Sequence, residues 1–180
     1  MDFIEVVAYK QEWHDQFLVL AGELRRALGE TAMRIDHIGS TSVAGLAAKP
    51  IIDIQISVRC LQTMEQYQIA LENAGYRYHS DNDDLSKRYF REGPENPRIH
   101  IHVREAGSWS EQLNLLFRDY LREQPEACKK YEEVKYGLAE RYRNDREAYV
   151  RGKEEVVWAI LRQAHGWSMH EGWKPGVSDA

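Results

Sequence analysis

The sequence of 180 residues has little of what marks several common protein classes. It contains two cysteines, Cys60 and Cys128, without the spacing of a metal site, so a reduced, cytoplasmic setting is expected. No apolar stretch approaches the length needed to cross a bilayer, so no membrane partner is expected. The first residues lack the basic and apolar regions of a signal peptide.

The chain also lacks the excess of basic residues that binders of duplex nucleic acid usually carry. Its 24 Lys and Arg residues are outnumbered by 29 Asp and Glu residues, which argues against that function but allows a local basic pocket. It contains no Walker-A loop, no Gly-x-Ser-x-Gly elbow and no His-Glu-x-x-His sequence. The commonest P-loop kinase, hydrolase and zincin mechanisms are therefore excluded.

What is present is the length and composition of one soluble globular domain, expected over residues 1–166. Hydrophobic periodicity divides it into a sheet half, about 1–106, and a helical half, about 108–166, followed by a tail at 167–180. Strands are expected at 4–8, 33–38, 50–58, 87–91 and 98–104, with the turn sequence EGPENP between the last two.

Two helices are expected in the sheet half and three in the helical half, each placed by apolar spacing and by its end signals. They are predicted at about 13–28, 61–74, 109–121, 125–142 and 145–166. The expected fold class is therefore α/β (α+β), with a mixed β-sheet flanked by helices and a C-terminal helical bundle.

The stretch HIGSTSVAGLAAKPIIDIQI, residues 37–56, is the most informative part of the chain. Gly39 permits a sharp turn, which exposes backbone N–H groups and the hydroxyls of Ser40 and Thr41 to bind phosphate oxygens. Asp53 follows on the next strand, where Gln55 points to the same face. An acid beside a Gly-Ser turn is an arrangement that holds Mg²⁺ against a nucleotide triphosphate.

This order of strand, Gly-Ser turn and acidic strand resembles the polymerase-beta-type nucleotidyltransferase superfamily. More narrowly, the chain resembles the GrpB family, and the resemblance covers most of its length. The matching stretches are YKQEWHDQF, HIGSTSVAGLAAKPIIDIQISV, AGYRY, RIHIHV, FRDYLREQPEACKKYEEVKYGLA and YVRGKEEVVWAIL. The resemblance implies a nucleotidyltransferase-like fold, a nucleotide or phosphorylated small molecule as partner, and a divalent metal such as Mg²⁺ at Asp53. Some family members are fused to dephospho-coenzyme A kinase.

The sequence departs from the superfamily pattern at two positions. Gln55 stands where a second acid is usual, and the strand RIHIHV offers His100 and His102 in place of a third acid. Two-metal nucleotidyl transfer uses several carboxylates, so Asp53 alone supports ordinary two-Mg²⁺ catalysis poorly.

His100 and His102 point to the same face of their strand. They either bind a transition metal or shuttle a proton beside Asp53, or they are merely hydrogen-bonded on a half-buried sheet face. We expect Asp53, Gln55, Ser40, His100 and His102 to line one cleft.

Several basic side chains are candidate phosphate ligands. Lys49, before a proline at a strand start, either reaches a phosphate or is simply solvated, and Arg88 is predicted to face the cleft as an anion ligand. Tyr149 and Lys153 lie four residues apart on one helix face, like the Lys and Tyr that related folds place over a triphosphate. A surface lysine packed on an aromatic ring is the alternative for this pair.

Three functions remain open: transfer of a nucleotidyl group, an inactive nucleotide- or phosphate-binding module, and other metal-dependent phosphate-ester chemistry. The third would use Asp53 with His100 and His102. The predicted catalytic residues are Asp53, His100 and His102, with Asp53 as metal ligand. The predicted substrate-binding residues are Gly39, Ser40, Thr41, Lys49, Gln55, Arg88, Tyr149 and Lys153.

Overall fold

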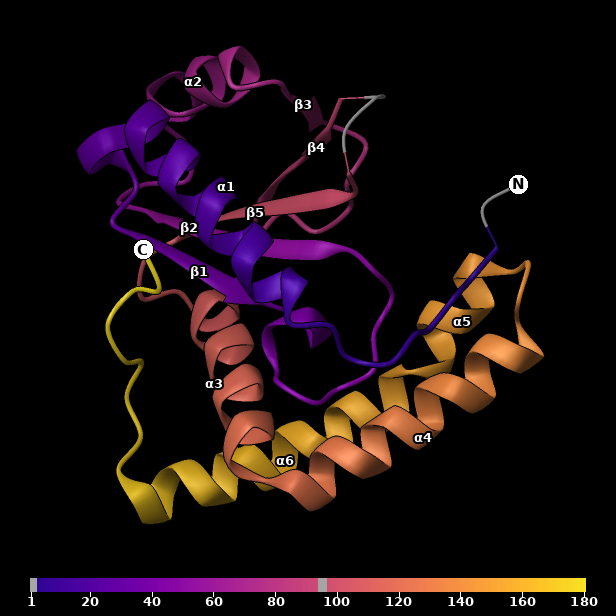
Figure 1. The fold of residues 1–180 in the computed structure, drawn as a ribbon. Coiled ribbons are helices and arrows are strands. Elements are labelled where there is room, and N and C mark those ends of the chain that lie inside the picture. Colours follow the sequence, from indigo (N-terminus) through magenta and orange to yellow (C-terminus); the bar gives the residue numbers. More distant parts are fainter. Residues whose placement is uncertain (1–2, 94–96) are drawn as a thin grey trace.

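A five-stranded mixed sheet separates two groups of helices (Figure 1). The structure, a computed structural model, describes residues 3–93 and 97–180. The strands are β1 Arg34–Ile38, β2 Ile52–Val58, β3 Tyr76–His79, β4 Arg88–Glu92 and β5 Ile99–Glu105. Their order in the sheet is β1-β2-β5-β4-β3, with β2 and β5 parallel and the other neighbours antiparallel.

The helices lie on both sides of this sheet. On one face lie α1 Glu12–Leu28 and α2 Gln68–Asn73. On the other side lie α3 Trp109–Glu123, α4 Pro125–Arg141, α5 Arg146–Gly152 and α6 Glu154–Glu171 (Figure 1). No helix within the described ranges is long and apolar enough to cross a membrane. The predicted fold class, a mixed sheet with flanking helices, is confirmed.

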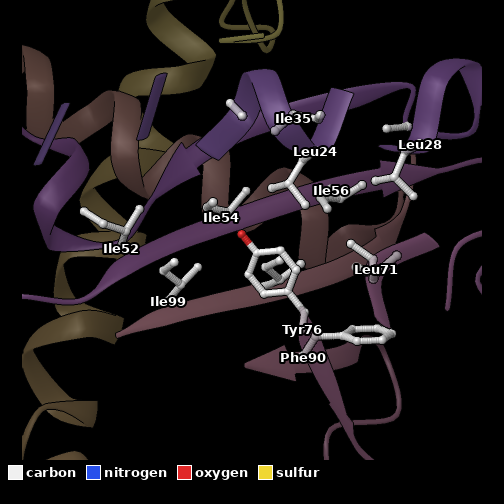
Figure 2. Close-up of a cluster of buried hydrophobic side chains, with 14 of the residues drawn as sticks. Leu24, Leu28, Ile35, Ile52, Ile54, Ile56, Leu71, Tyr76, Phe90 and Ile99 are labelled. Atoms are coloured by element: carbon white, nitrogen blue, oxygen red, sulfur yellow. The ribbon is translucent and has the colours of Figure 1, made fainter. Parts of the chain in front are cut away.

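Side chains of β2 point alternately to the two faces of the sheet, one of which faces the core and the other the candidate site. Ile54 and Ile56 are fully buried and face α1 and α2, where Leu24 and Leu71 complete the core (Figure 2). Because successive strand residues point to opposite faces, Asp53 and Gln55 face the helical half instead. A second, smaller core joins the segment after the Gly-Ser turn to α3, α4 and α6.

The structure corrects some predicted elements. The strand expected at 4–8 is reduced to one bridge, between Val7 and Ala48, and the helix expected at 61–74 is a short 3₁₀ turn followed by α2. The third helix of the helical half breaks at Lys153 into α5 and α6, and it continues past Gly166 to Glu171. The strand β3 was not predicted. The EGPENP turn includes residues 94–96, which lie outside the described residues.

The C-terminal residues run beside β1 (Figure 1). Ser178 Oγ accepts a hydrogen bond from Ile35 N at 2.8 Å, and Ala180 N donates to Ile35 O at 3.1 Å. Asp179 accepts from His37 N and from the Arg118 guanidinium, both at 2.9 Å. The segment treated as a tail in the sequence therefore covers the outer edge of β1.

Candidate functional site

A polar cavity of 260 Å³ lies between the Gly-Ser turn, the first residues of β2 and β5, and the helices α4 and α5. Its lining residues are Gly39, Ser40, Thr41, Ala48, Lys49, Ile51, Asp53, His100, Tyr131, Lys135, Arg146, Tyr149 and Lys153.

Hydrogen bonds of two hydroxyl groups hold the Gly-Ser turn in its conformation. Gly39 adopts φ +72°, a backbone conformation that favours glycine. Thr41 Oγ1 donates to Ile51 O at 3.0 Å and lies 3.1 Å from His37 Nε2, while Ser42 Oγ donates to Gly39 O at 2.6 Å. The hydroxyls of Thr41 and Ser42 therefore shape the turn.

Asp53 meets both predicted histidines at the base of the cavity. Its Oδ1 lies 3.2 Å from His100 Nδ1 and 3.3 Å from His102 Nε2, because β2 and β5 pair with Asp53 opposite His100. Burial acts to raise the pKa of Asp53, but hydrogen bonds from His100 and His102 outweigh it and hold the pKa below its ordinary value. The Tyr89 ring packs beside both imidazoles, with centroids 5.5 and 5.3 Å away.

Four cationic side chains and one carboxylate line the cavity. Lys49 and Lys153 place their ammonium groups 5.3 and 4.9 Å from the centre of the Tyr149 ring. Burial, followed by the charge of Lys153, lowers the pKa of Lys49 to about 8 and that of Lys135 to about 7. Burial also lowers the pKa of Lys153. The cavity thus concentrates positive charge that has little carboxylate to balance it.

The structure brings most of the predicted site residues together. Those that line the cavity are Gly39, Ser40, Thr41, Lys49, Asp53, His100, Tyr149 and Lys153. His102 does not line the cavity itself, but its Nε2 lies against the Asp53 carboxylate.

Two predicted residues do not reach the cavity. Gln55 is on the expected face but lies buried under α3, where its amide accepts from Asn114 Nδ2 at 2.9 Å and donates to Glu111 O at 3.3 Å. Arg88 pairs with Val103 of β5, a core residue, and so points to the opposite face of the sheet. Neither is placed to touch a ligand in the cavity.

Three lining residues with polar side chains were missed by the sequence analysis: Tyr131, Lys135 and Arg146. Tyr131 hydrogen-bonds Ser40, and burial raises its pKa to about 12. The Lys135 ammonium donates to Ala47 O and lies 4.6 Å from the Tyr131 ring centre. Tyr131 and Lys135 are four residues apart, so the sequence predicts that they share one face of their helix. It does not predict that this face packs against the Gly-Ser turn.

The chain matches a family model described as GrpB protein over residues 3–163. It is 34% identical over 164 residues to UPF0157 protein YqkA of Bacillus subtilis, covering 91% of this chain and 48% of that protein. It is also 34% identical over 197 residues to a dephospho-CoA kinase of Mycolicibacterium paratuberculosis, covering 96% of this chain and 48% of the kinase. The chain therefore spans about half the length of these two relatives.

Solved structures show the same fold. The crystal structure of conserved protein GrpB from Enterococcus faecalis superposes with a TM-score of 0.83 at 32% identity, covering 94% of this chain and 100% of that one. A Cid1 poly(U) polymerase with bound MgGTP superposes with a TM-score of 0.53 at 13% identity, covering 76% of this chain and 45% of that one. The second likeness concerns the fold alone.

Proposed function

The chain belongs to the GrpB family, and we propose that it binds the phosphate groups of a nucleotide or phosphorylated small molecule in the cavity beside the Gly39–Ser40 turn. One observation carries this proposal. The cavity is lined by four cationic side chains, Lys49, Lys135, Lys153 and Arg146, and by a single carboxylate, that of Asp53. Burying cations without acidic partners costs stability, and an anionic ligand would remove that cost.

The parts of the cavity suit a phosphate chain. Gly39, Ser40 and Thr41 of the turn line the cavity, and the Lys49 and Lys153 ammonium groups both lie close to the Tyr149 ring. A volume of 260 Å³ is smaller than the roughly 300–1,000 Å³ usual for small-molecule pockets. The cavity therefore suits the phosphate groups, and the rest of the ligand would extend beyond it.

Transfer of a nucleotidyl group with metal help is the second candidate. The fold and the position of Asp53 beside the turn favour it. The engagement of Gln55 with α3 weighs against it, because the second metal-ligand position of the superfamily pattern is then missing. Binding is accordingly the function we propose, with phosphate-ester chemistry as an additional step only if a metal is held at Asp53.

A binding screen on the full chain, treated with EDTA, tests the proposal. Pyrophosphate, nucleoside triphosphates and coenzyme A derivatives should raise the melting temperature without metal. A ligand at a hundredfold its Kd stabilises by about 2.7 kcal/mol. The double variant Lys49→Gln/Lys153→Gln should weaken binding at least tenfold, while Lys129→Gln, on the exposed surface of α4, should not change it. Equal binding by both variants, or no binding by the wild type, would contradict the proposal.

A further inference from the structure

We infer that Asp53, His100 and His102 bind one divalent transition-metal ion of the Zn²⁺ or Co²⁺ type, in place of the Mg²⁺ ions expected from the fold. The role of this ion rests on the proposed function, because Asp53 and His100 also line the phosphate cavity. Metal binding itself can be measured without any phosphate ligand.

The side chains at this end of the sheet do not fit a pair of Mg²⁺ ions. Magnesium requires oxygen ligands, usually one or two carboxylates with phosphates and waters. Asp36, opposite Gln55 on β1, is fully buried and is bound by Arg34 at 2.9 Å, with Arg118 at 3.6 Å. The amide of Gln55 is already engaged with α3. Asp53 is left as the one carboxylate among the residues that line the cavity.

The same side chains do fit a single transition metal. Two imidazoles and one carboxylate are a usual ligand set for zinc and its neighbours, with one or more positions left open. With metal–ligand distances of about 2.0–2.1 Å, the edge of a tetrahedral site measures about 3.4 Å. Asp53 Oδ1 lies 3.2 and 3.3 Å from the two histidine nitrogens. The three ligand atoms all lie within 4.8 Å of one another, the only such group within residues 3–93 and 97–180.

The surroundings fix the direction of both imidazoles. The ring nitrogen of His100 that faces Asp53 Oδ1 is Nδ1, and that of His102 is Nε2. The Tyr89 ring packs against both imidazoles and restrains them beside Asp53. When bound, such an ion would supply polarisation of a phosphate oxygen or a water of lowered pKa.

The test titrates EDTA-treated full-length protein with Co²⁺, Zn²⁺ and Mg²⁺ in the absence of phosphate. Co²⁺ should give a visible absorption spectrum with histidine ligation and one ion per chain. Zn²⁺ should displace Co²⁺, and Mg²⁺ should bind at least tenfold more weakly than either. Asp53→Asn and His102→Gln should each weaken Zn²⁺ binding at least tenfold. His165→Gln, exposed on α6 outside the site, should leave Zn²⁺ binding unchanged.

Zn²⁺ binding that is unchanged in folded His102→Gln, or Mg²⁺ binding as tight as Zn²⁺ binding, would overturn the inference. If His102→Gln does not fold, as judged by circular dichroism, His100→Gln replaces it in the same titration. Pyrophosphate binding is measured in parallel with EDTA present. Retained pyrophosphate binding without a Zn²⁺ site would overturn only the metal inference, and a Zn²⁺ site without pyrophosphate binding would overturn only the proposed function.

Discussion

Gly39 lies directly against the carboxylate of Asp53: a Cβ at residue 39 would stand 2.6 Å from Asp53 Oδ2. Two separate constraints therefore act on this position, the positive φ and the close approach of the acid. We expect Gly39→Ala to destabilise the protein by about 2–3 kcal/mol and to displace Asp53 from its histidines. Urea unfolding measures the first effect, and loss of Zn²⁺ binding measures the second.

Gly45→Ala is the matched control. Gly45 also has a positive φ, +81°, but a Cβ there would meet no atom within 4 Å. It should lose about 1 kcal/mol from backbone strain and keep metal and phosphate binding. Equal effects of the two substitutions on binding would show that the contact with Asp53 does not explain the glycine at position 39.

Gln55→Glu tests whether position 55 belongs to the metal site. A carboxylate there cannot donate to Glu111 O, and it would be buried opposite Asp36. We expect a loss of about 1–3 kcal/mol of stability at pH 7 and no gain in Mg²⁺ affinity. Gln16→Glu, exposed on α1, is the control and should change neither quantity. A gain in Mg²⁺ affinity would place residue 55 among the metal ligands after all.

The parts of the site that the sequence predicted depend on local geometry. Strand alternation is enough to put Asp53 on one face and His100 with His102 on one face of their strand. That the two strands are neighbours, with Asp53 opposite His100, depends on pairing that only the folded chain shows. The resemblance to a known fold made this pairing a reasonable expectation.

The errors come from features that are not local. The alternation of side chains along β2 predicts the sheet face on which Gln55 lies. It does not predict that helix α3 covers this part of the face. The register of β4 decides the side of Arg88, because a shift of one residue exchanges the two faces of a strand. Lys135 and Arg146 could not be assigned because the packing direction of α4 and α5 on the turn depends on contacts distant in sequence.

Phosphate binding should weaken as the pH rises. The pKa of Lys135 is lowered to about 7 and that of Lys49 to about 8, so both lose charge in the cavity between about pH 6 and 9. A bound anion favours the charged forms, and binding in this range should therefore take up protons. Calorimetry of pyrophosphate binding in buffers of different ionisation enthalpy measures that uptake. Lys135→Gln removes the group titrating near pH 7, and a pH profile that this variant leaves unaltered would contradict the assignment.

Lys135 should also cost the protein stability, because it is 2% exposed and its pKa in the folded state is lowered by burial. A lowered lysine pKa destabilises fully below about pH 7, and the cost fades as the pH rises from about 7 toward 10.5. Lys135→Met keeps most of the side-chain volume but loses the bond to Ala47 O. We expect it to stabilise by about 1–3 kcal/mol at pH 6, and by less at pH 9, while weakening pyrophosphate binding. Urea unfolding at the two pH values measures this difference. An equal change at both would show that the buried charge is not what the substitution relieves.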